Sequence, residues 1–192
     1  MRIIAGEFRG RRLASVRGRL RPTSDLVREA VFNILGPAVA GARVLDLFAG
    51  TGALALEALS RGAARAVVVE DQAAALEVLR KNIEALKVAD RVTVLSLPVF
   101  IAVKKLALRR EPFHIIFLDP PYERGFAAET LRTLAASGLP APGAWVVAEH
   151  SRREELPDHP GSLRLHQRRR YGDTVVSFYQ EEEPTPLEEE RH

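Results

Sequence analysis

The sequence predicts an α/β fold, in which helices cover one mostly parallel sheet of seven strands and an antiparallel hairpin closes it. Three observations support this prediction. The chain of 192 residues has room for one domain, strand-like and helix-like runs alternate through its middle, and the last two strand-like runs are joined by a two-residue turn. Because successive strand–helix–strand units form parallel, right-handed crossovers, the alternation predicts a parallel sheet.

The first segment is rich in glycine and arginine. Residues 1–22 carry short apolar pieces separated by Gly6, Gly10 and Gly18, which predicts a basic hairpin extension. A main domain is expected over residues 23–180. It opens with a helix that is capped by Thr23 or Ser24 and stopped by the dipeptide at residues 36–37.

The alternation then begins. The expected strands are residues 43–47, 66–69, 92–95, 113–118 and 144–148, and the expected helices are residues 53–61, 73–87, 98–108 and 127–136. The runs at residues 163–171 and 174–179 are separated only by Gly172 and Asp173, which is typical of a hairpin.

Composition excludes several classes of protein. Hydrophobic residues make up 46% and charged residues 28%, as in globular proteins and unlike disordered or fibrous ones. No apolar run reaches the roughly 18 residues of a membrane span, and the N-terminus lacks the apolar stretch of a secretory signal, so we expect a cytoplasmic protein that starts near Met1. The absence of Cys excludes disulfides and thiolate chemistry, and the five scattered His residues predict no metal site.

Charge is distributed unevenly along the chain. Residues 181–192 carry a formal charge of −5 and are expected to form an acidic, mobile tail, which leaves +8 on residues 1–180 and +6 on the first 28 residues alone. Guanidinium groups pair well with phosphates, so this basic N-terminal segment favours nucleic-acid binding over a merely solvated surface. Its candidate phosphate-binding residues are Arg9, Arg11 and Arg12.

A glycine turn follows the first strand of the alternation. Asp46 lies at the end of this strand, Gly50 and Gly52 let the backbone approach a ligand closely, and Glu70 ends the next strand, where it can accept hydrogen bonds from both ribose hydroxyls. An acid at Asp46 would repel a pyrophosphate but suits the methionyl ammonium group. The order therefore favours S-adenosyl-L-methionine over a dinucleotide.

The second motif, Asp-Pro-Pro-Tyr at residues 119–122, ends another strand of the same sheet. An exocyclic amine of a base is a poor nucleophile because its lone pair is delocalised. The Asp119 carboxylate and the Pro120 carbonyl can hold such an amine with its lone pair directed at a methyl donor, and Tyr122 can stack on a flipped base. With the seven strands and the closing hairpin, the two motifs predict a Rossmann-like, class I S-adenosylmethionine-dependent methyltransferase fold.

These motifs, in this order, resemble those of the amino-group methyltransferases that act on bases and on some protein amides. Flanking segments narrow the resemblance to the RsmD family over residues 1–180; they are RIIAG at 2–6, RGR at 9–11, RPT at 21–23, REA at 28–30, FNIL at 32–35, LSRGA at 59–63 and RYGDT at 170–174. The resemblance implies methylation of N2 of a guanine in 16S ribosomal RNA of the small ribosomal subunit.

The resemblance also implies roles for individual residues. The implied donor site comprises Asp46, Phe48, Gly50, Gly52, Glu70, Asp71, Ser96, Leu97 and Asp119. The implied catalytic residues are Asp119, Pro120 and Tyr122. The implied substrate-binding residues are Arg9, Arg11, Arg12, Arg21, Thr23, Arg28 and Tyr122. In this family Arg21, Thr23 and Arg28 belong to a segment that folds back over the donor pocket.

One departure and two alternatives stand beside this reading. Residues 96–98 are Ser-Leu-Pro where such enzymes commonly have Asp or Asn near adenine, so adenine recognition falls to backbone amides or to Ser96.

A DNA adenine-N6 or protein glutamine-N5 methyltransferase would use the same amine chemistry, although the chain has no separate target-recognition domain. A non-catalytic RNA-binding assembly factor is the other alternative, against which the two intact motifs argue. We expect a monomer.

Overall fold

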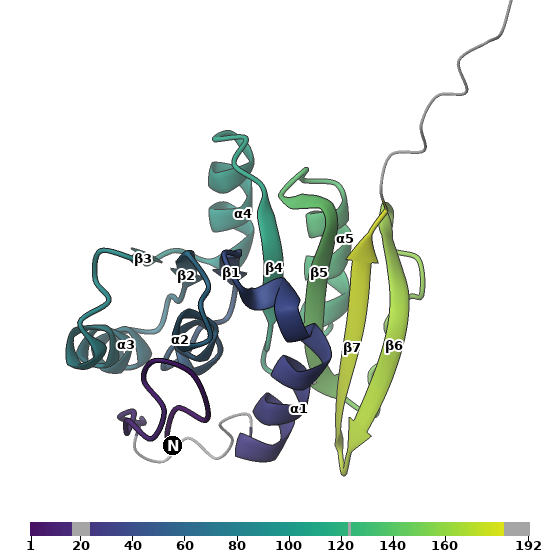
Figure 1. Ribbon diagram of the computed structural model, residues 1–192. Helices are drawn as coiled ribbons and strands as arrows, with labels where there is room; N and C mark the ends of the chain where they lie inside the picture. The colour runs from purple at the N-terminus through teal and green to yellow at the C-terminus, as the bar shows by residue number, and fades with distance from the viewer. Residues whose placement is uncertain (17–23, 123, 183–192) are drawn as a thin grey trace, which may run out of the picture.

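The computed structural model describes residues 1–16, 24–122 and 124–182. Its centre is one seven-stranded sheet with the strand order β3-β2-β1-β4-β5-β7-β6. The strands are β1 (Arg43–Asp46), β2 (Arg65–Val69), β3 (Val92–Leu95), β4 (Phe113–Leu118), β5 (Pro140–Ser151), β6 (Leu163–Tyr171) and β7 (Thr174–Glu181). Strands β1 to β5 pair in parallel, and β7 is inserted antiparallel between β5 and β6 (Figure 1). The predicted fold class is confirmed.

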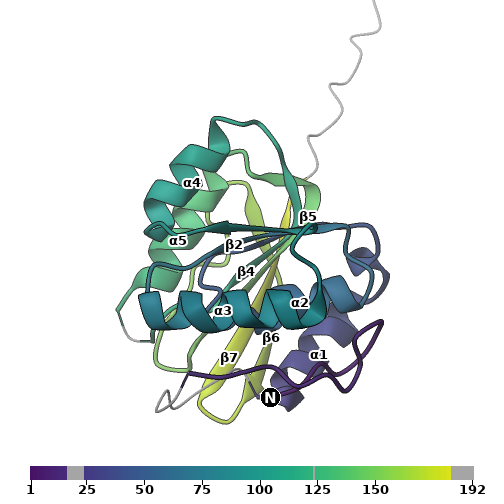
Figure 2. The same ribbon diagram turned by 90° about the vertical axis from the view of Figure 1, so that its left-hand side faces the viewer.

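Helices cover both faces of the sheet. They are α1 (Asp25–Leu35), the 3-10 turn η1 (Gly36–Val39), α2 (Ala53–Ser60), α3 (Ala73–Leu86), α4 (Val99–Ala107) and α5 (Phe126–Ala135). Helices α1, α2 and α3 lie on one face, and α4 and α5 lie on the other (Figure 2). Ser24 caps α1 by accepting a hydrogen bond from the Val27 amide at 3.2 Å, as one of the two predicted caps.

The core has two layers because successive side chains of a strand point to opposite faces. In the central strand β4, Ile115 and Phe117 pack with the helices α1 to α3, whereas Ile116 and Leu118 pack with α4 and α5. All four side chains are buried. This double burial explains the continuous apolar run at residues 115–118 of β4, as expected of a central parallel strand.

Two strands extend beyond their predicted ends. Strand β5 spans Pro140–Ser151 rather than residues 144–148, because the antiparallel pairing with β7 continues to the pair of Ser151 with Thr174. Strand β7 likewise includes Glu181, whose carboxylate accepts a hydrogen bond from the Ser162 hydroxyl at 2.9 Å. Glu181 therefore belongs to the sheet and not to the predicted acidic tail, and residues 183–192, on which the rest of that prediction falls, lie outside the described ranges.

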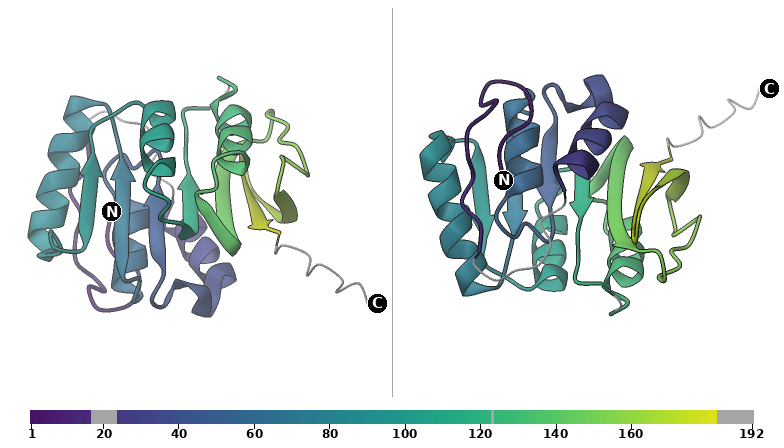
Figure 3. Two further views of the ribbon diagram at one scale, coloured as in Figure 1. Left: turned by 90° about the horizontal axis from the view of Figure 1, so that it is seen from above. Right: turned by 90° about the horizontal axis from the view of Figure 1, so that it is seen from below.

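The N-terminal segment folds as a hairpin-like strap against the domain. Arg2 and Arg12 form an isolated antiparallel bridge, and the side chains of Ile3 and Leu13 are buried in the core. Figure 3 shows this purple segment beside helix α2. The Glu57 carboxylate of α2 accepts hydrogen bonds from the amides of Ile4 and Ala5 at 2.8 and 3.1 Å. The strap is therefore packed into the fold rather than attached to its surface.

Candidate active site

A pocket of about 860 Å³ opens at the carboxyl ends of the parallel strands, the edge where open α/β sheets bind ligands. Five acidic side chains line it. In the order of the strands they are Glu70 and Asp71 after β2, Asp46 at the end of β1, Asp119 after β4, and Glu149 on β5. We name the part formed by β1, β2 and the residues that follow them the β1–β2 half. The part formed by residues 119–122 and Glu149 is the β4–β5 half.

Glu70 is fixed by the backbone of the β1–β2 half. One carboxylate oxygen accepts a hydrogen bond from the Gly50 amide at 2.8 Å, and the other accepts from the amides of Asp71 and Gln72 at 3.0 and 2.9 Å. Hydrogen bonds to a charged acceptor are among the stronger ones, so the side chain is held in a single orientation against the pocket. Its position supports the predicted role as a hydrogen-bond acceptor.

Asp46 is almost completely buried, with 1% of its surface exposed. Burial raises the pKa of its carboxyl group to about 7, although hydrogen bonds from the backbone amides of Phe48 and Ala55 act in the opposite direction. Its Oδ1 atom has no hydrogen-bond partner among the described residues. A buried, unsatisfied acceptor in a pocket wall is costly unless a ligand supplies a donor, and a cationic ammonium group fits this position.

The two glycines of the turn have different functions. Gly50 has a φ of 54°, lines the pocket and donates its amide to Glu70. Gly52 has a φ of 84° and caps α2, and an added Cβ would lie only 2.5 Å from Leu79. The predicted ligand contact of Gly52 is not seen among the pocket-lining residues. Instead, Gly52 lets α2 pack closely against α3.

One wall of the β1–β2 half, formed by residues that follow β3, is apolar. Leu97 belongs to this wall and lines the pocket as predicted, whereas Ser96 is not among the lining residues. Asp71, which follows β2, also lines the pocket as predicted. The residues that follow, Pro98 to Phe100, also line it, and the sequence analysis did not identify them. Apolar walls of this kind suit a flat ring system. The only signal in the sequence was that the expected polar residue near adenine is missing.

The β4–β5 half contains the whole Asp-Pro-Pro-Tyr turn. Residues 119–122 all line the pocket. The Tyr122 hydroxyl donates a hydrogen bond to Glu149 at 2.5 Å and lies 3.1 Å from the Thr174 hydroxyl. Burial and the negative charge of Glu149 raise the pKa of Tyr122, so the phenol stays protonated at neutral pH. This contact links the turn to β5 and β7.

Glu149 was not identified from the sequence. The predicted strand stopped at residue 148, one position before it, so the end of an apolar strand was the signal that pointed to this position. Phe126, at the start of α5, is another lining residue that was missed. Its ring lies 6.5 Å from that of Phe48, which lines the pocket as predicted.

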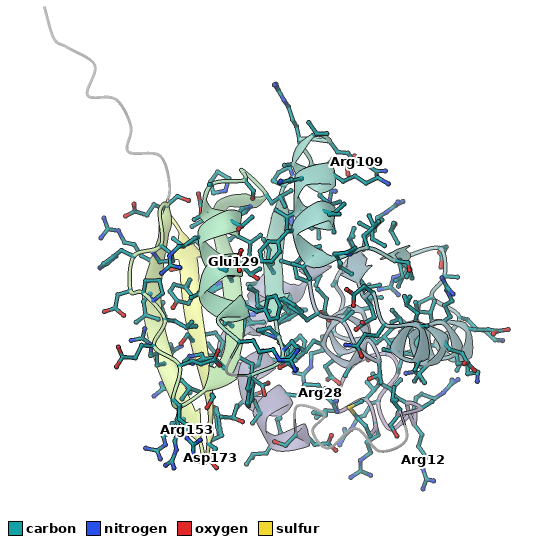
Figure 4. The ribbon with its side chains drawn as sticks, turned by 180° about the vertical axis from the view of Figure 1, so that it is seen from behind. Arg12, Arg28, Arg109, Glu129, Arg153 and Asp173 are labelled. Carbon is teal, nitrogen blue, oxygen red and sulfur yellow. The ribbon has the colours of Figure 1, made fainter. Side chains whose placement is uncertain are left out.

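The predicted RNA-binding arginines fall into three groups. Arg9, Arg11 and Arg12 are exposed on the strap, although Arg11 also donates a hydrogen bond to the Ala85 carbonyl at 2.6 Å. Arg21 and Thr23 lie outside the described residues. Arg28, in contrast, has no exposed surface, and Figure 4 labels it within the fold and Arg12 at its periphery.

Arg28 is surrounded by the strap, α1 and α2 and does not line the pocket. Its guanidinium group donates hydrogen bonds to the Arg2 carbonyl at 2.5 Å and to Asp25 at 3.0 Å, and its Nε lies 3.8 Å from the buried Glu57. The residue is absent from the pocket lining. This differs from the predicted contact with donor or base, because the strap and α2 surround the charge instead.

Two absences hold for the part of the chain that the structure describes. Helices in these ranges are too short or too polar to cross a bilayer. The described His, Asp and Glu side chains form no cluster of three suited to a metal ion.

The sheet order and the pocket at its carboxyl edge define the class of fold: it is the Rossmann-like fold of the class I S-adenosylmethionine-dependent methyltransferases. The chain belongs to the family described as "Conserved hypothetical protein 95", which matches residues 1–180. This confirms the family resemblance drawn from the motifs.

Individual relatives agree with this assignment. The Escherichia coli protein named "Ribosomal RNA small subunit methyltransferase D" is 40% identical over 183 residues, which are 95% of this chain and 90% of that protein. The solved structure of E. coli yhhF is 36% identical and has a TM-score of 0.84, covering 96% of this chain and 99% of its own. A T. thermophilus 16S rRNA N2 methyltransferase, RsmC, solved with AdoMet and guanosine, is 28% identical with a TM-score of 0.64. It covers 86% of this chain and 44% of its own.

Proposed function

We propose that this protein transfers a methyl group from S-adenosyl-L-methionine to the exocyclic N2 amine of a guanine in 16S rRNA of the small ribosomal subunit. The observation that carries the proposal is the meeting of two sites in one pocket. The β1–β2 half fits the methyl donor, and the Asp-Pro-Pro-Tyr turn of the β4–β5 half fits a planar amine. The names of the E. coli relative and of the T. thermophilus neighbour support the RNA substrate and the N2 position.

The donor would be held by groups of the β1–β2 half. Glu70 is fixed to accept hydrogen bonds from the ribose hydroxyls, and Asp46 offers its unsatisfied oxygen to the methionyl ammonium group. The apolar wall from Leu97 to Phe100 suits the adenine ring. When bound, S-adenosyl-L-methionine supplies an electrophilic methyl group on a sulfonium.

The turn would position the target amine. The Asp119 carboxylate and the Pro120 carbonyl accept hydrogen bonds from the NH2 group, so that the nitrogen lone pair is directed away from the ring plane. Transfer would form the N–C bond as the S–CH3 bond of the donor breaks, with S-adenosylhomocysteine as the leaving group, and the proton that the amine loses would pass to water. The Tyr122 ring supports the flipped base by stacking, and its protonated hydroxyl keeps the ring anchored to Glu149.

The basic strap would hold the RNA. Arg9, Arg11 and Arg12 are exposed on it, while Met1, Ser15 and Val16 of the same segment line the pocket. The strap thus extends from the exposed arginines to the pocket, and its charges can contact phosphates around a flipped nucleotide.

The product of the reaction tests this proposal. The protein is incubated with labelled S-adenosyl-L-methionine and with either 16S rRNA or small subunits from a strain in which its gene is deleted, followed by nucleoside mass spectrometry. N2-methylguanosine is the expected product. Parallel incubations with DNA and with total protein test the alternative enzymes, which would be favoured by N6-methyladenine in the DNA or by methylglutamine in peptide mass spectra. Donor and RNA binding without transfer to RNA or subunits would favour the assembly factor.

A further inference from the structure

The register of the sheet brings two carboxylates together in the β4–β5 half. Leu118 of β4 pairs with Ala148 of β5 in parallel, so Asp119 and Glu149 each follow one residue later at the same edge of the sheet. Neighbouring strands are about 4.8 Å apart, and both side chains line the pocket. The structure therefore places a second acceptor next to the carboxylate that the proposed function assigns to the target amine.

Glu149 is held rigidly in this position. Only 9% of its surface is exposed, and its Oε1 accepts the 2.5 Å hydrogen bond from Tyr122, whose hydroxyl also contacts Thr174. The bond with Tyr122 therefore orients the carboxylate, a group that can accept about four hydrogen bonds in total.

The bases that carry an exocyclic amine differ in what lies beside it. In adenine the N6 amine is next to a ring nitrogen with a lone pair, and in cytosine the N4 amine is next to another such nitrogen. In guanine the N2 amine is next to the N1–H donor. Two neighbouring carboxylates match two neighbouring donors, whereas Glu149 would face a lone pair in the other two bases. Enzymes that flip a base commonly read this Watson–Crick edge.

We propose that Glu149 is the specificity-determining residue of the pocket, and that it selects guanine by accepting a hydrogen bond from N1–H while Asp119 holds the adjacent amine. This inference rests on the proposed function. Asp119 and its prolines can hold any planar amine, so they do not explain the choice of base. A site built around a hydrogen-bond acceptor rejects an analogue that lacks the donor, because the buried acceptor then faces a lone pair instead.

A guanine analogue separates this function from a merely structural one. 2-Aminopurine keeps the amine and the stacking face, but its N1 is an acceptor and it lacks the O6 carbonyl, so the Glu149 variant described below is needed to assign the preference to N1. Small subunits are reconstituted with 16S rRNA that carries either guanine or 2-aminopurine at the methylated position, and the two rates of methyl transfer are compared. The wild-type protein is expected to prefer guanine by roughly ten-fold or more, since a hydrogen bond to a charged acceptor is removed.

Two variants complete the experiment. Glu149→Gln preserves the size of the side chain and an acceptor for Tyr122, but its amide can donate to N1 of the analogue, so the preference for guanine should fall to about three-fold or less. Tyr122→Phe leaves the carboxylate but removes one of the bonds that orient it, so it should retain more of the preference for guanine than Glu149→Gln does, even if its rate falls. Calorimetric donor affinity reports whether each variant is folded.

The outcomes distinguish the inference from the proposed function. A wild-type protein that makes N2-methylguanosine but methylates both bases equally overturns the inference alone, and this result requires no variant. The same holds if a folded Glu149→Gln variant keeps the wild-type preference, or if Tyr122→Phe loses the preference to the same extent as Glu149→Gln. A wild-type product other than N2-methylguanosine overturns both.

Discussion

The two halves of the pocket are held together by different kinds of bond. In the β1–β2 half, three backbone amides hold Glu70, and the glycine turn is part of the same arrangement. In the β4–β5 half, the Tyr122 hydroxyl joins the side chains of Glu149 and Thr174. Backbone hydrogen bonds tolerate changes of neighbouring side chains, whereas a side-chain network changes with any member. A change of one side chain should therefore disturb the β4–β5 half more than the β1–β2 half.

If the β1–β2 half binds the donor independently of the β4–β5 half, removing the Asp119 carboxylate should cause the largest loss of activity and leave donor binding intact. We expect Asp119→Ala to lower the rate of methyl transfer by roughly 100- to 1000-fold, because the interaction acts mainly on the reacting nitrogen. Donor affinity by calorimetry should change less than about two-fold. The matched control, Asp90→Ala, removes an exposed acid and should be fully active. A large loss of donor affinity in Asp119→Ala would mean that the halves are coupled.

The reciprocal change lies in the β1–β2 half. Glu70→Ala should weaken donor binding by about ten- to a hundred-fold, since it removes a charged acceptor worth roughly 1.5–3 kcal/mol. The variant also removes the carboxylate that accepts a hydrogen bond from the Gly50 amide. Calorimetry with S-adenosyl-L-methionine measures the effect, and Glu84→Ala on the exposed side of α3 is the control. Unchanged affinity in a folded Glu70→Ala variant would remove Glu70 from the donor site.

Asp46 makes donor binding depend on pH. Burial raises its pKa to about 7, so the charged form that binds an ammonium group becomes about ten times more populated between pH 6 and pH 8. Donor affinity should therefore rise about ten-fold over this interval in the wild-type protein. Asp46→Asn should bind more weakly and show no such rise. A flat wild-type profile would argue against an ion pair at Asp46.

The raised pKa of Asp46 has the opposite effect on the stability of the ligand-free protein, which falls as the pH rises. The pKa is higher in the folded protein than in the unfolded chain, so the protonated carboxyl favours folding. This contribution is complete below about pH 4 and is lost as the pH rises through about 7. Denaturant unfolding should show the loss in the wild-type protein and a smaller loss in Asp46→Asn. Equal pH dependence in both proteins would contradict the assignment.

The smallest expected effect per residue concerns the strap, which lies outside both halves. Neutralising Arg9, Arg11 and Arg12 together should weaken RNA binding and reduce its salt slope by about 0.7–0.9 for each phosphate that is no longer neutralised. Donor binding should persist. The control neutralises Lys105, Arg109 and Arg110, which are exposed at the end of α4 and just after it. Figure 4 shows Arg109 far from Arg12. Equal salt slopes for the two triple variants would assign the strap arginines to a solvated surface.

The difference between the halves also explains what could be predicted from the sequence. Backbone-defined features follow from local patterns, so the glycine turn, Glu70 and the Asp-Pro-Pro-Tyr turn were recognised as motifs. Glu149 depends on the pairing of β5 with β7, and this long-range pairing extends the strand beyond its apolar run.

Two misplaced residues have similar causes. Arg28 was expected near the ligand because the family resemblance implied that its segment folds over the donor pocket. In the structure, Glu57 and the Arg2 carbonyl, which are distant in sequence, surround it instead. Leu97 faces the pocket and Ser96 is not among its lining residues. The local pattern does not determine which of two successive residues after a strand will face a ligand.

The strap also constrains the order of events during synthesis. The amide of Ile4 binds Glu57, which is 53 residues later, and the amide of Ala14 binds Asn82, which is 68 residues later. A ribosome adds about 5–20 residues per second, so the first segment to emerge waits several seconds for its partners. Ile3 and Leu13, which are buried in the folded protein, lack these neighbours during that interval. The beginning of this chain thus cannot reach its final place before residue 82 has been made.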